Sequence, residues 1–279
     1  MRRMLAALTA ALVVVLGLAS PTRADDGLLP ELPTSPAGDP PGANDWSCVP
    51  TAQRPTPVIL VHGTLGDRRH LLERMSRKLK EAGFCVYSLD YGNRATEDVR
   101  DSAQELKLFT ERVLEATGAE KVSMVGHSQG GMMPRYYIKY LGGDQVVDDL
   151  VGVAPSNHGS SITGPPGMNP LAPILDALMP ALGQQAAGSA FLTDLNAGDE
   201  TPGDVSYTQI TTEYDEIVRP HTSGYLASGP RTTNLTIQDV CRLDLSEHVL
   251  IPASLITIAV TIDALTREGP ARADFPRRC

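Results

Sequence analysis

The stretch KVSMVGHSQGGMMP, residues 121–134, decides the fold of this chain. Its apolar start predicts a short buried strand, and the residues after Ser128 predict the first turns of a helix. The turn between them reads Gly126-His127-Ser128-Gln129-Gly130, a G-x-S-x-G pattern. Such a turn lifts the serine hydroxyl clear of the sheet, next to helix N–H groups that have no partner within the helix. The pattern predicts a nucleophile at Ser128; a glycine-rich connecting loop is the alternative.

The first residues predict a signal peptide, residues 1–24, that is cleaved from a secreted, extracellular protein. Arg2 and Arg3 precede an apolar run, and Thr22-Arg23-Ala24 offers small residues at a cleavage site. The run from Leu5 to Leu18 is shorter than the roughly 20 residues that cross a bilayer, which disfavours a membrane anchor.

The remaining chain predicts one large domain. Pro, Gly and Asp are frequent over residues 25–56, which predicts a flexible N-terminal arm over residues 25–45. Trp46 is expected to dock this arm onto a domain formed by residues 46–279. The formal net charge of −9 argues against nucleic acid as a partner, and an aromatic content of 5% leaves few rings for base stacking.

Four cysteines follow the signal: Cys48, Cys85, Cys241 and Cys279. In an exported chain they predict disulfides, and because none stands in a C-x-x-C pair, a zinc site is not indicated. Of the three possible pairings we favour Cys48 with Cys85 and Cys241 with Cys279. Cys48 precedes the first core strand, Cys85 opens the next, and a chain end gains most from a tether. The other two pairings remain open.

Apolar runs alternate with amphipathic segments along the chain. Predicted strands cover residues 57–62, 84–89, 122–125, 149–153, 205–211 and 232–240, and predicted helices cover residues 67–83, 98–117, 129–140 and 245–265. This alternation predicts an α/β fold with a mostly parallel central sheet flanked by helices. Residues 160–202 are rich in Gly, Pro and Ala and predict a lid-like insertion at the sheet edge where function collects.

A serine hydroxyl needs a base to take its proton and an acid to orient that base. In sheet enzymes with this turn the chain order is serine, acid, histidine, which leaves His158, His221 and His248 as candidates. We expect His248 to be the base because it follows the last strand. His158 is expected to form pocket wall or loop packing, and His221 to be solvated.

The acid should end the strand before the last one. Asp215 is our candidate, in the sequence Tyr214-Asp215-Glu216. Three carboxylates compete with it. Glu213 and Glu216 are expected to be solvated, and Asp239 lies on the wrong strand.

An oxyanion pocket needs two backbone donors aimed at the developing charge. The N–H of Gln129, directly after the nucleophile, is one candidate, and the N–H of Thr64, in the loop after the first core strand, is the other. The Thr64 hydroxyl either adds a donor or caps the loop. Nothing in the sequence indicates a metal or an organic cofactor.

Five motifs together carry a family resemblance. They are Val61-His62-Gly63-Thr64, Gly126-His127-Ser128-Gln129-Gly130-Gly131, Pro155-Ser156-Asn157-His158-Gly159, Tyr214-Asp215-Glu216-Ile217-Val218 and Leu245-Ser246-Glu247-His248. In this order the chain resembles, over roughly residues 45–279, the secreted actinobacterial lipases and esterases of the α/β-hydrolase fold, the class 2 lipase, EstA-like group. The resemblance implies hydrolysis of acylglycerols or simpler carboxylic esters. It also implies Ser128, Asp215 and His248 as the triad, and both disulfides.

The predicted function is therefore that of a secreted serine ester hydrolase, a lipase or esterase. The expected partners are a lipid or small ester substrate and, transiently, a lipid interface, with no protein partner implied. The long insertion argues against a polyester or cutin hydrolase with an open site. An extracellular acyltransferase would share the same acyl-enzyme, and a non-catalytic secreted binding protein is the alternative from another class.

Overall fold

The computed structural model describes residues 38–161, 177–277 and 279. Three predictions lie wholly or partly outside these described residues. They are the signal of residues 1–24, the arm up to residue 37, and residues 162–176 of the lid-like insertion.

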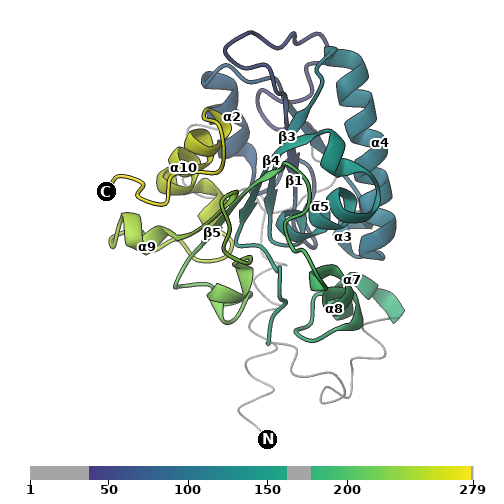
Figure 1. Ribbon diagram of the computed structural model, residues 1–279, viewed down its shortest axis with the longest axis vertical. Coiled ribbons are helices and arrows are strands. Elements are labelled where there is room, and N and C mark those ends of the chain that lie inside the picture. Colours follow the sequence, from purple (N-terminus) through teal and green to yellow (C-terminus); the bar gives the residue numbers. More distant parts are fainter. Residues whose placement is uncertain (1–37, 162–176, 278) are drawn as a thin grey trace, which may run out of the picture.

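A parallel sheet of six strands forms the centre of the described chain, in the order β2-β1-β3-β4-β5-β6 (Figure 1). The strands are β1 (Val58–Val61), β2 (Val86–Leu89), β3 (Val122–His127), β4 (Val147–Val153), β5 (Ser206–Thr211) and β6 (Thr232–Thr236). In β1, Ile59 and Val61 pack into one apolar cluster, whereas Val58 and Leu60 pack into another on the opposite face. Burial on both faces explains the continuous apolar runs, and the predicted fold class is confirmed.

Helices cover both faces of this sheet (Figure 1). Two of them, α4 (Val99–Thr117) and α5 (Gln129–Tyr140), cover one face, and α2 (Glu73–Glu81) and α10 (Leu255–Leu265) cover the other. The shorter segments are α3 (Gly92–Ala95), η1 (Gly143–Gln145), α7 (Pro180–Gln184), α8 (Ala190–Asn196), η2 (His221–Gly224), α9 (Ile237–Val240) and η3 (Ile251–Ala253). Among the helices in the described ranges, none combines the length and the apolar character needed to cross a membrane.

The helix predicted over residues 67–83 is shorter than expected. Leu71 adopts a left-handed φ of 64°, which a continuing right-handed helix does not allow. The Asp67 carboxylate also accepts the backbone N–H of His70 at 3.1 Å, so a local turn takes the place of the first helical turns. As a result α2 begins only at Glu73.

Two predictions near the C-terminus are wrong in part. The last strand ends at Thr236, because the chain turns directly into α9. The helix predicted over residues 245–265 starts only after Ser254. Pro252 has no N–H to give to a helix, and the Ser254 hydroxyl oxygen caps α10 by accepting the N–H of Ile256 at 3.1 Å.

The segment before the first strand is attached to the edge strand β2. The Asn44 side-chain amide donates to the Ser88 carbonyl at 2.9 Å, and its oxygen accepts the Ser88 N–H at 2.9 Å. The ring centroid of Trp46 lies 5.0 Å from that of Tyr87. Trp46 thus packs against the sheet, and Asn44, within the range predicted to be a flexible arm, is bonded to β2. Whether Trp46 docks the whole arm stays a prediction.

Both favoured disulfides are present. Cys48 is bonded to Cys85, which fastens the segment before β1 to the start of β2. Cys241 is bonded to Cys279, which fastens the C-terminal segment to the end of α9. The pairing that the sequence favoured is confirmed.

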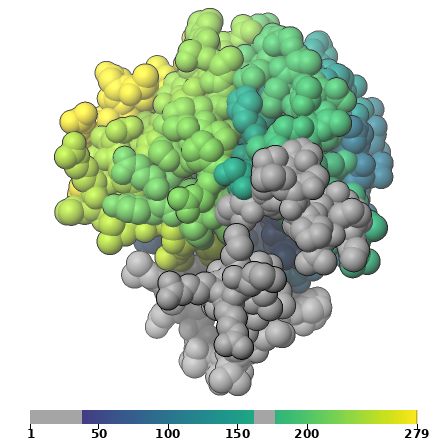
Figure 2. Space-filling view, turned by 90° about the horizontal axis from the view of Figure 1, so that it is seen from below, coloured from purple at the N-terminus to yellow at the C-terminus, as the bar shows by residue number. Residues whose placement is uncertain are grey.

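The described end of the insertion packs against the main body. Phe191 and Leu192 of α8 belong to the same buried cluster as the inner faces of α4 and α5. The buried guanidinium of Arg135, in α5, donates to the Asn196 side-chain oxygen at 2.8 Å and to the Glu200 carbonyl at 3.3 Å. The green surface of this segment adjoins the lighter green surface of the residues after β5 (Figure 2). Whether residues 160–202 act as a lid stays a prediction.

Candidate active site

Ser128 stands in a sharp turn between β3 and α5. Its backbone has φ 56° and ψ −123°, a conformation that side chains other than glycine rarely adopt. The neighbouring glycines are required, because a Cβ added at Gly126 would lie 1.8 Å from the Gly130 carbonyl oxygen. A Cβ added at Gly130 would lie 2.2 Å from the Val61 carbonyl oxygen. The turn exists at this place because the sequence supplies glycine on both sides of the serine.

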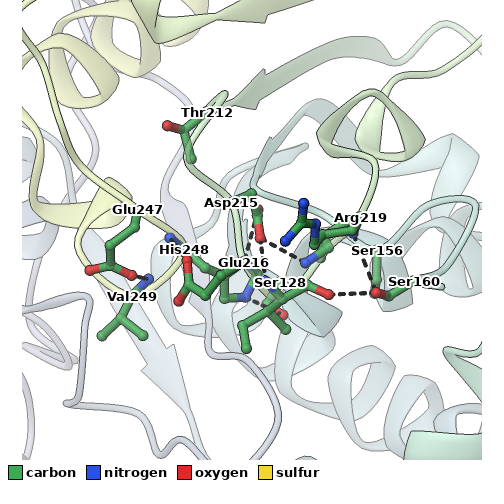
Figure 3. A network of polar contacts seen from close by, with 12 residues as sticks. Ser128, Ser156, Ser160, Thr212, Asp215, Glu216, Arg219, Glu247, His248 and Val249 are labelled. Carbon is green, nitrogen blue, oxygen red and sulfur yellow. Dashed lines mark hydrogen bonds and ion pairs between the residues drawn. The ribbon is translucent and has the colours of Figure 1, made fainter. Parts of the chain in front are cut away.

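Three side chains from distant parts of the chain meet at this turn (Figure 3). His248 Nε2 lies 3.1 Å from Ser128 Oγ, and His248 Nδ1 lies 2.9 Å from Asp215 Oδ2. All three residues are buried, with exposed fractions of 7% for Ser128, 6% for Asp215 and 5% for His248. In this arrangement the imidazole can exchange a proton with the serine while the carboxylate accepts its Nδ1–H.

Asp215 lies in the loop after β5 and not at the end of the strand, which stops at Thr211. The loop turns back on itself at this residue, because Asp215 Oδ1 accepts the N–H of Ile217 at 2.9 Å and that of Val218 at 2.7 Å. These two bonds leave Oδ2 directed at the imidazole. The loop therefore fixes the orientation of the carboxylate as well as its place.

Two further histidines lie beside the site. His127 Nε2 donates to the His248 carbonyl at 2.9 Å, and the two ring centroids are 4.9 Å apart. Burial lowers the pKa of His127 to about 3, and burial lowers the pKa of His62 to about 4. Both rings are therefore neutral at physiological pH and add no positive charge near His248. No role for His127 was predicted from the sequence; its place directly before Ser128 is the only signal that could have suggested one.

The loop after β1 lies on the other side of Ser128. A Cβ added at Gly63 would lie 2.9 Å from Ser128 Cβ, so this loop and Ser128 are in close contact. Thr64 follows, half-buried, and its hydroxyl oxygen accepts the Gln185 side-chain amide at 2.9 Å. The loop is also tied to α3, because the Leu65 N–H donates to the Arg94 carbonyl at 2.7 Å.

Gln129 begins α5 directly after Ser128 and is fully buried. Its side-chain oxygen lies 3.4 Å from the hydroxyl of Tyr91, which donates to the His62 carbonyl at 2.6 Å. The first N–H groups of a helix have no intrahelical acceptor. The positions predicted for the oxyanion pocket, Thr64 and Gln129, thus both belong to segments that adjoin the serine.

Sequence reasoning missed a buried brace between the loops that carry Asp215 and His248. The Thr212 hydroxyl donates to the Ser246 carbonyl at 2.7 Å. The Gln238 side-chain amide donates to Thr212 Oγ1 at 3.0 Å and to the Asp244 carbonyl at 2.8 Å. These residues have no motif spacing, so no sequence signal marks them.

The competing candidates make other contacts. Glu216 accepts the backbone N–H of His248 at 3.3 Å, but the ring of His248 is paired with Asp215. His158 is paired with the Glu200 carboxylate at 3.0 Å and with the Ser223 carbonyl at 3.1 Å, so it packs the loops together. The ring of His221 lies edge-on to that of Tyr225. Of the competing acids, Glu213, Glu216 and Asp239 are all exposed. Within the described ranges, no three His, Cys, Asp or Glu side chains gather as a possible metal-binding group.

The sheet, its covering helices and the serine turn define an α/β-hydrolase fold. The profile of the family described as "Lipase (class 2)" matches residues 55–251, more than half of the chain. The chain belongs to the class 2 lipase family.

Similar proteins include two triacylglycerol lipases. One, from Pseudarthrobacter phenanthrenivorans, is 31% identical over 110 residues, covering 37% of this chain and 34% of that protein. The other, from Burkholderia plantarii, is 31% identical over 110 residues, covering 37% of this chain and 30% of that protein. The matched part is thus about a third of the length of these relatives.

Solved structures with the same fold include two lipases. Lipase B of Aspergillus fumigatus matches with a TM-score of 0.70 and 22% identity, over 85% of this chain and 57% of that one. The mature lipase BlEst2 of Bacillus licheniformis matches with a TM-score of 0.58 and 18% identity, over 78% of this chain and 94% of that one. At these identities the likeness concerns the fold.

Proposed function

We propose that this protein is a serine carboxylic-ester hydrolase, a triacylglycerol lipase or esterase that works through an acyl-enzyme. The observation that carries the proposal is the contact chain from Asp215 through His248 to Ser128, in a buried position at a strained turn. The family and the triacylglycerol lipases among its relatives support the same reaction class.

In the proposed reaction, the Ser128 oxygen attacks the ester carbonyl while its proton passes to His248 Nε2. The tetrahedral intermediate places its negative oxygen at the N–H groups of Thr64 and Gln129. His248 then gives the proton to the leaving alcohol, and the acyl group stays on Ser128. A water molecule, activated by the same imidazole, releases the acid. Asp215 remains ionised throughout and accepts the Nδ1–H of His248.

Exposed apolar side chains favour a lipid surface as the place of action. Ile217 and Tyr214 project from the Asp215 loop with exposed fractions of 47% and 45%. Leu243, Leu245 and Val249 are exposed on the loop that carries His248. The two loops are neighbours, because Glu216 accepts the backbone N–H of His248. Exposed apolar residues on adjoining loops are typical of a surface that contacts another apolar phase. We therefore propose that these two loops touch the lipid during turnover.

Export from the cell fits the two disulfides, because such bonds persist in oxidising compartments. We propose that the mature protein is extracellular and begins after residue 24. Mass spectrometry of the native secreted protein would test this: an N-terminus within residues 1–20 would contradict it.

The decisive experiment is hydrolysis of a soluble short-chain ester by the wild type and by Ser128→Ala. We expect the substitution to lower kcat on the order of 10⁴- to 10⁶-fold. Ser123→Ala, at the start of the same strand and bonded to Asp149, is the matched control and should keep its activity. Full activity in Ser128→Ala would refute the proposed nucleophile.

A lipase is distinguished from an esterase by its faster hydrolysis of substrate at a lipid–water interface. The wild type should hydrolyse emulsified long-chain triacylglycerol faster than its rate on the soluble ester predicts. The double variant Ile217→Ser/Val249→Ser should lose this increase at the emulsion but keep its activity on the soluble ester. Leu108→Ser, at an even more exposed apolar position on α4, should lose neither. If the emulsion gives no gain with the wild type, the protein is an esterase.

A further inference from the structure

Gln185 follows α7 in the described end of the insertion, and both the nitrogen and the oxygen of its side-chain amide form hydrogen bonds. The amide nitrogen donates to Thr64 Oγ1 at 2.9 Å and to the Ala181 carbonyl at 3.0 Å. The amide oxygen accepts the Ser156 hydroxyl at 2.9 Å. Its backbone carbonyl also accepts the Ser160 N–H at 3.1 Å, which fixes the residue in place.

The two side chains that Gln185 joins belong to different strand ends. Thr64 lies in the loop after β1, and Ser156 lies in the loop after β4. In the sheet, β1 and β4 are the two neighbours of β3, the strand that leads into Ser128. Gln185 therefore spans the end of the nucleophile strand and holds the loops on both sides of it at a fixed separation.

We propose that Gln185 is a positioning residue for the oxyanion pocket, which fixes the Thr64 backbone donor relative to Ser128. This inference rests on the proposed function. A donor contributes to the rate only when it is aimed at the oxyanion, and small misplacements of such groups lower turnover. Because Gln185 belongs to the insertion and Thr64 to the main body, the inference also makes the rate of the chemical step depend on how the insertion is seated.

The neighbouring residue provides a matched control. Gln184 is the same residue type, is likewise half-buried, and also uses its side chain in a hydrogen bond to a distant part of the chain. Its oxygen accepts the Val99 N–H at 2.8 Å, at the start of α4. Gln184 thus holds the insertion to the body, whereas Gln185 holds it to the site.

The test compares Gln185→Met with Gln184→Met, both of which keep the length of the side chain and remove its hydrogen bonds. With a soluble ester, we expect Gln185→Met to lower kcat about 10- to 100-fold with KM changed less than about threefold. Gln184→Met should keep kcat within about twofold of the wild type. The Tm of Gln184→Met should nevertheless fall by about as much as the Tm of Gln185→Met. Equal kcat losses in the two variants would overturn the inference, because they would reflect general loosening of the insertion.

A double-mutant cycle tests the route through Thr64. If Gln185 acts through the Thr64 hydroxyl, the double variant Gln185→Met/Thr64→Val should have the same kcat as whichever single variant has the lower kcat. Independent, multiplying losses would contradict this route. A wild type with Ser128-dependent activity and an unaffected Gln185→Met would refute this inference alone. A wild type without ester hydrolysis would refute the proposed function, and this inference with it.

Discussion

Ser128 lies between two groups of loops that are held in different ways. On one side, the Asp215 and His248 loops are joined by Thr212 and Gln238, whose side chains are buried and bonded to each other. On the other side, Thr64 is half-buried and its side-chain partner, Gln185, is half-buried and belongs to the insertion. Hydrogen bonds sealed from water are costly to break, whereas those near the surface exchange with water more readily. The difference indicates that the side proposed for proton transfer is held rigidly, whereas the side proposed for the oxyanion pocket is more adjustable.

Breaking the proton-transfer side at its buried carboxylate should have the largest effect. Asp215→Asn leaves the shape of the site but cannot hold the imidazole in the tautomer that accepts the Ser128 proton. We expect kcat to fall on the order of 10⁴-fold, measured by steady-state hydrolysis of a soluble ester. Asp239→Asn, an exposed acid on α9, is the control and should behave like the wild type. A loss below about tenfold for Asp215→Asn would assign the orienting role elsewhere.

Loosening the brace should have an intermediate effect. Thr212→Val keeps the shape of the side chain but removes its bond to the Ser246 carbonyl, so His248 is held less firmly. We expect kcat to fall about tenfold with little change in KM. Thr211→Val removes a buried hydroxyl that bonds to Thr236 instead, so it should lower Tm without lowering kcat. If both variants lose the same activity, the brace has no special link to the site.

The contact between Glu216 and Glu247, on the same two loops, should have the smallest effect, and this effect is on stability. Glu216 accepts the His248 N–H at 3.3 Å, and Glu247 lies next to it. Burial and the charge of Glu216 raise the pKa of Glu247 above the ordinary value of a glutamate. The folded state therefore holds the Glu247 proton more tightly than the unfolded state does. The stability that this protonation contributes is lost as pH rises through the pKa of Glu247 in the folded protein.

Glu247→Gln should remove this pH dependence. We expect the Tm of the wild type to fall between pH 4 and pH 7 by about 1–2 °C more than that of the variant, because solvent screens a half-exposed pair. The other ionisable groups on these loops stay in both proteins, as does Arg74 of α2, which donates to the Ala253 carbonyl. These groups are Glu213, Asp215, Glu216, Arg219, Arg242, Asp244 and His248. Thermal melts across this range measure the difference, and parallel curves would show that the pair shares no proton.

The sequence predicts the parts of this molecule that rest on repeated or spaced patterns. The apolar runs mark the strands, and Ser128, Asp215 and His248 follow strand ends that parallel pairing brings to one edge. Thr212, Gln238 and Gln185 are not predictable in this way, because each bonds to a carbonyl or hydroxyl from a remote loop. The end of the last strand and the start of α10 were misjudged because local turns prevailed over apolar character.

The backbone of Ser128 has a consequence for the evolution of stability in this fold. A residue with a side chain in this positive-φ conformation destabilises the folded state by about 1–3 kcal/mol. Glycine at the same position would not carry this cost. Ser128→Gly should therefore yield an inert protein that melts at a higher temperature than the wild type. Selection for robustness alone would drive the hydroxyl out of this turn, and only a demand for chemistry can keep it there.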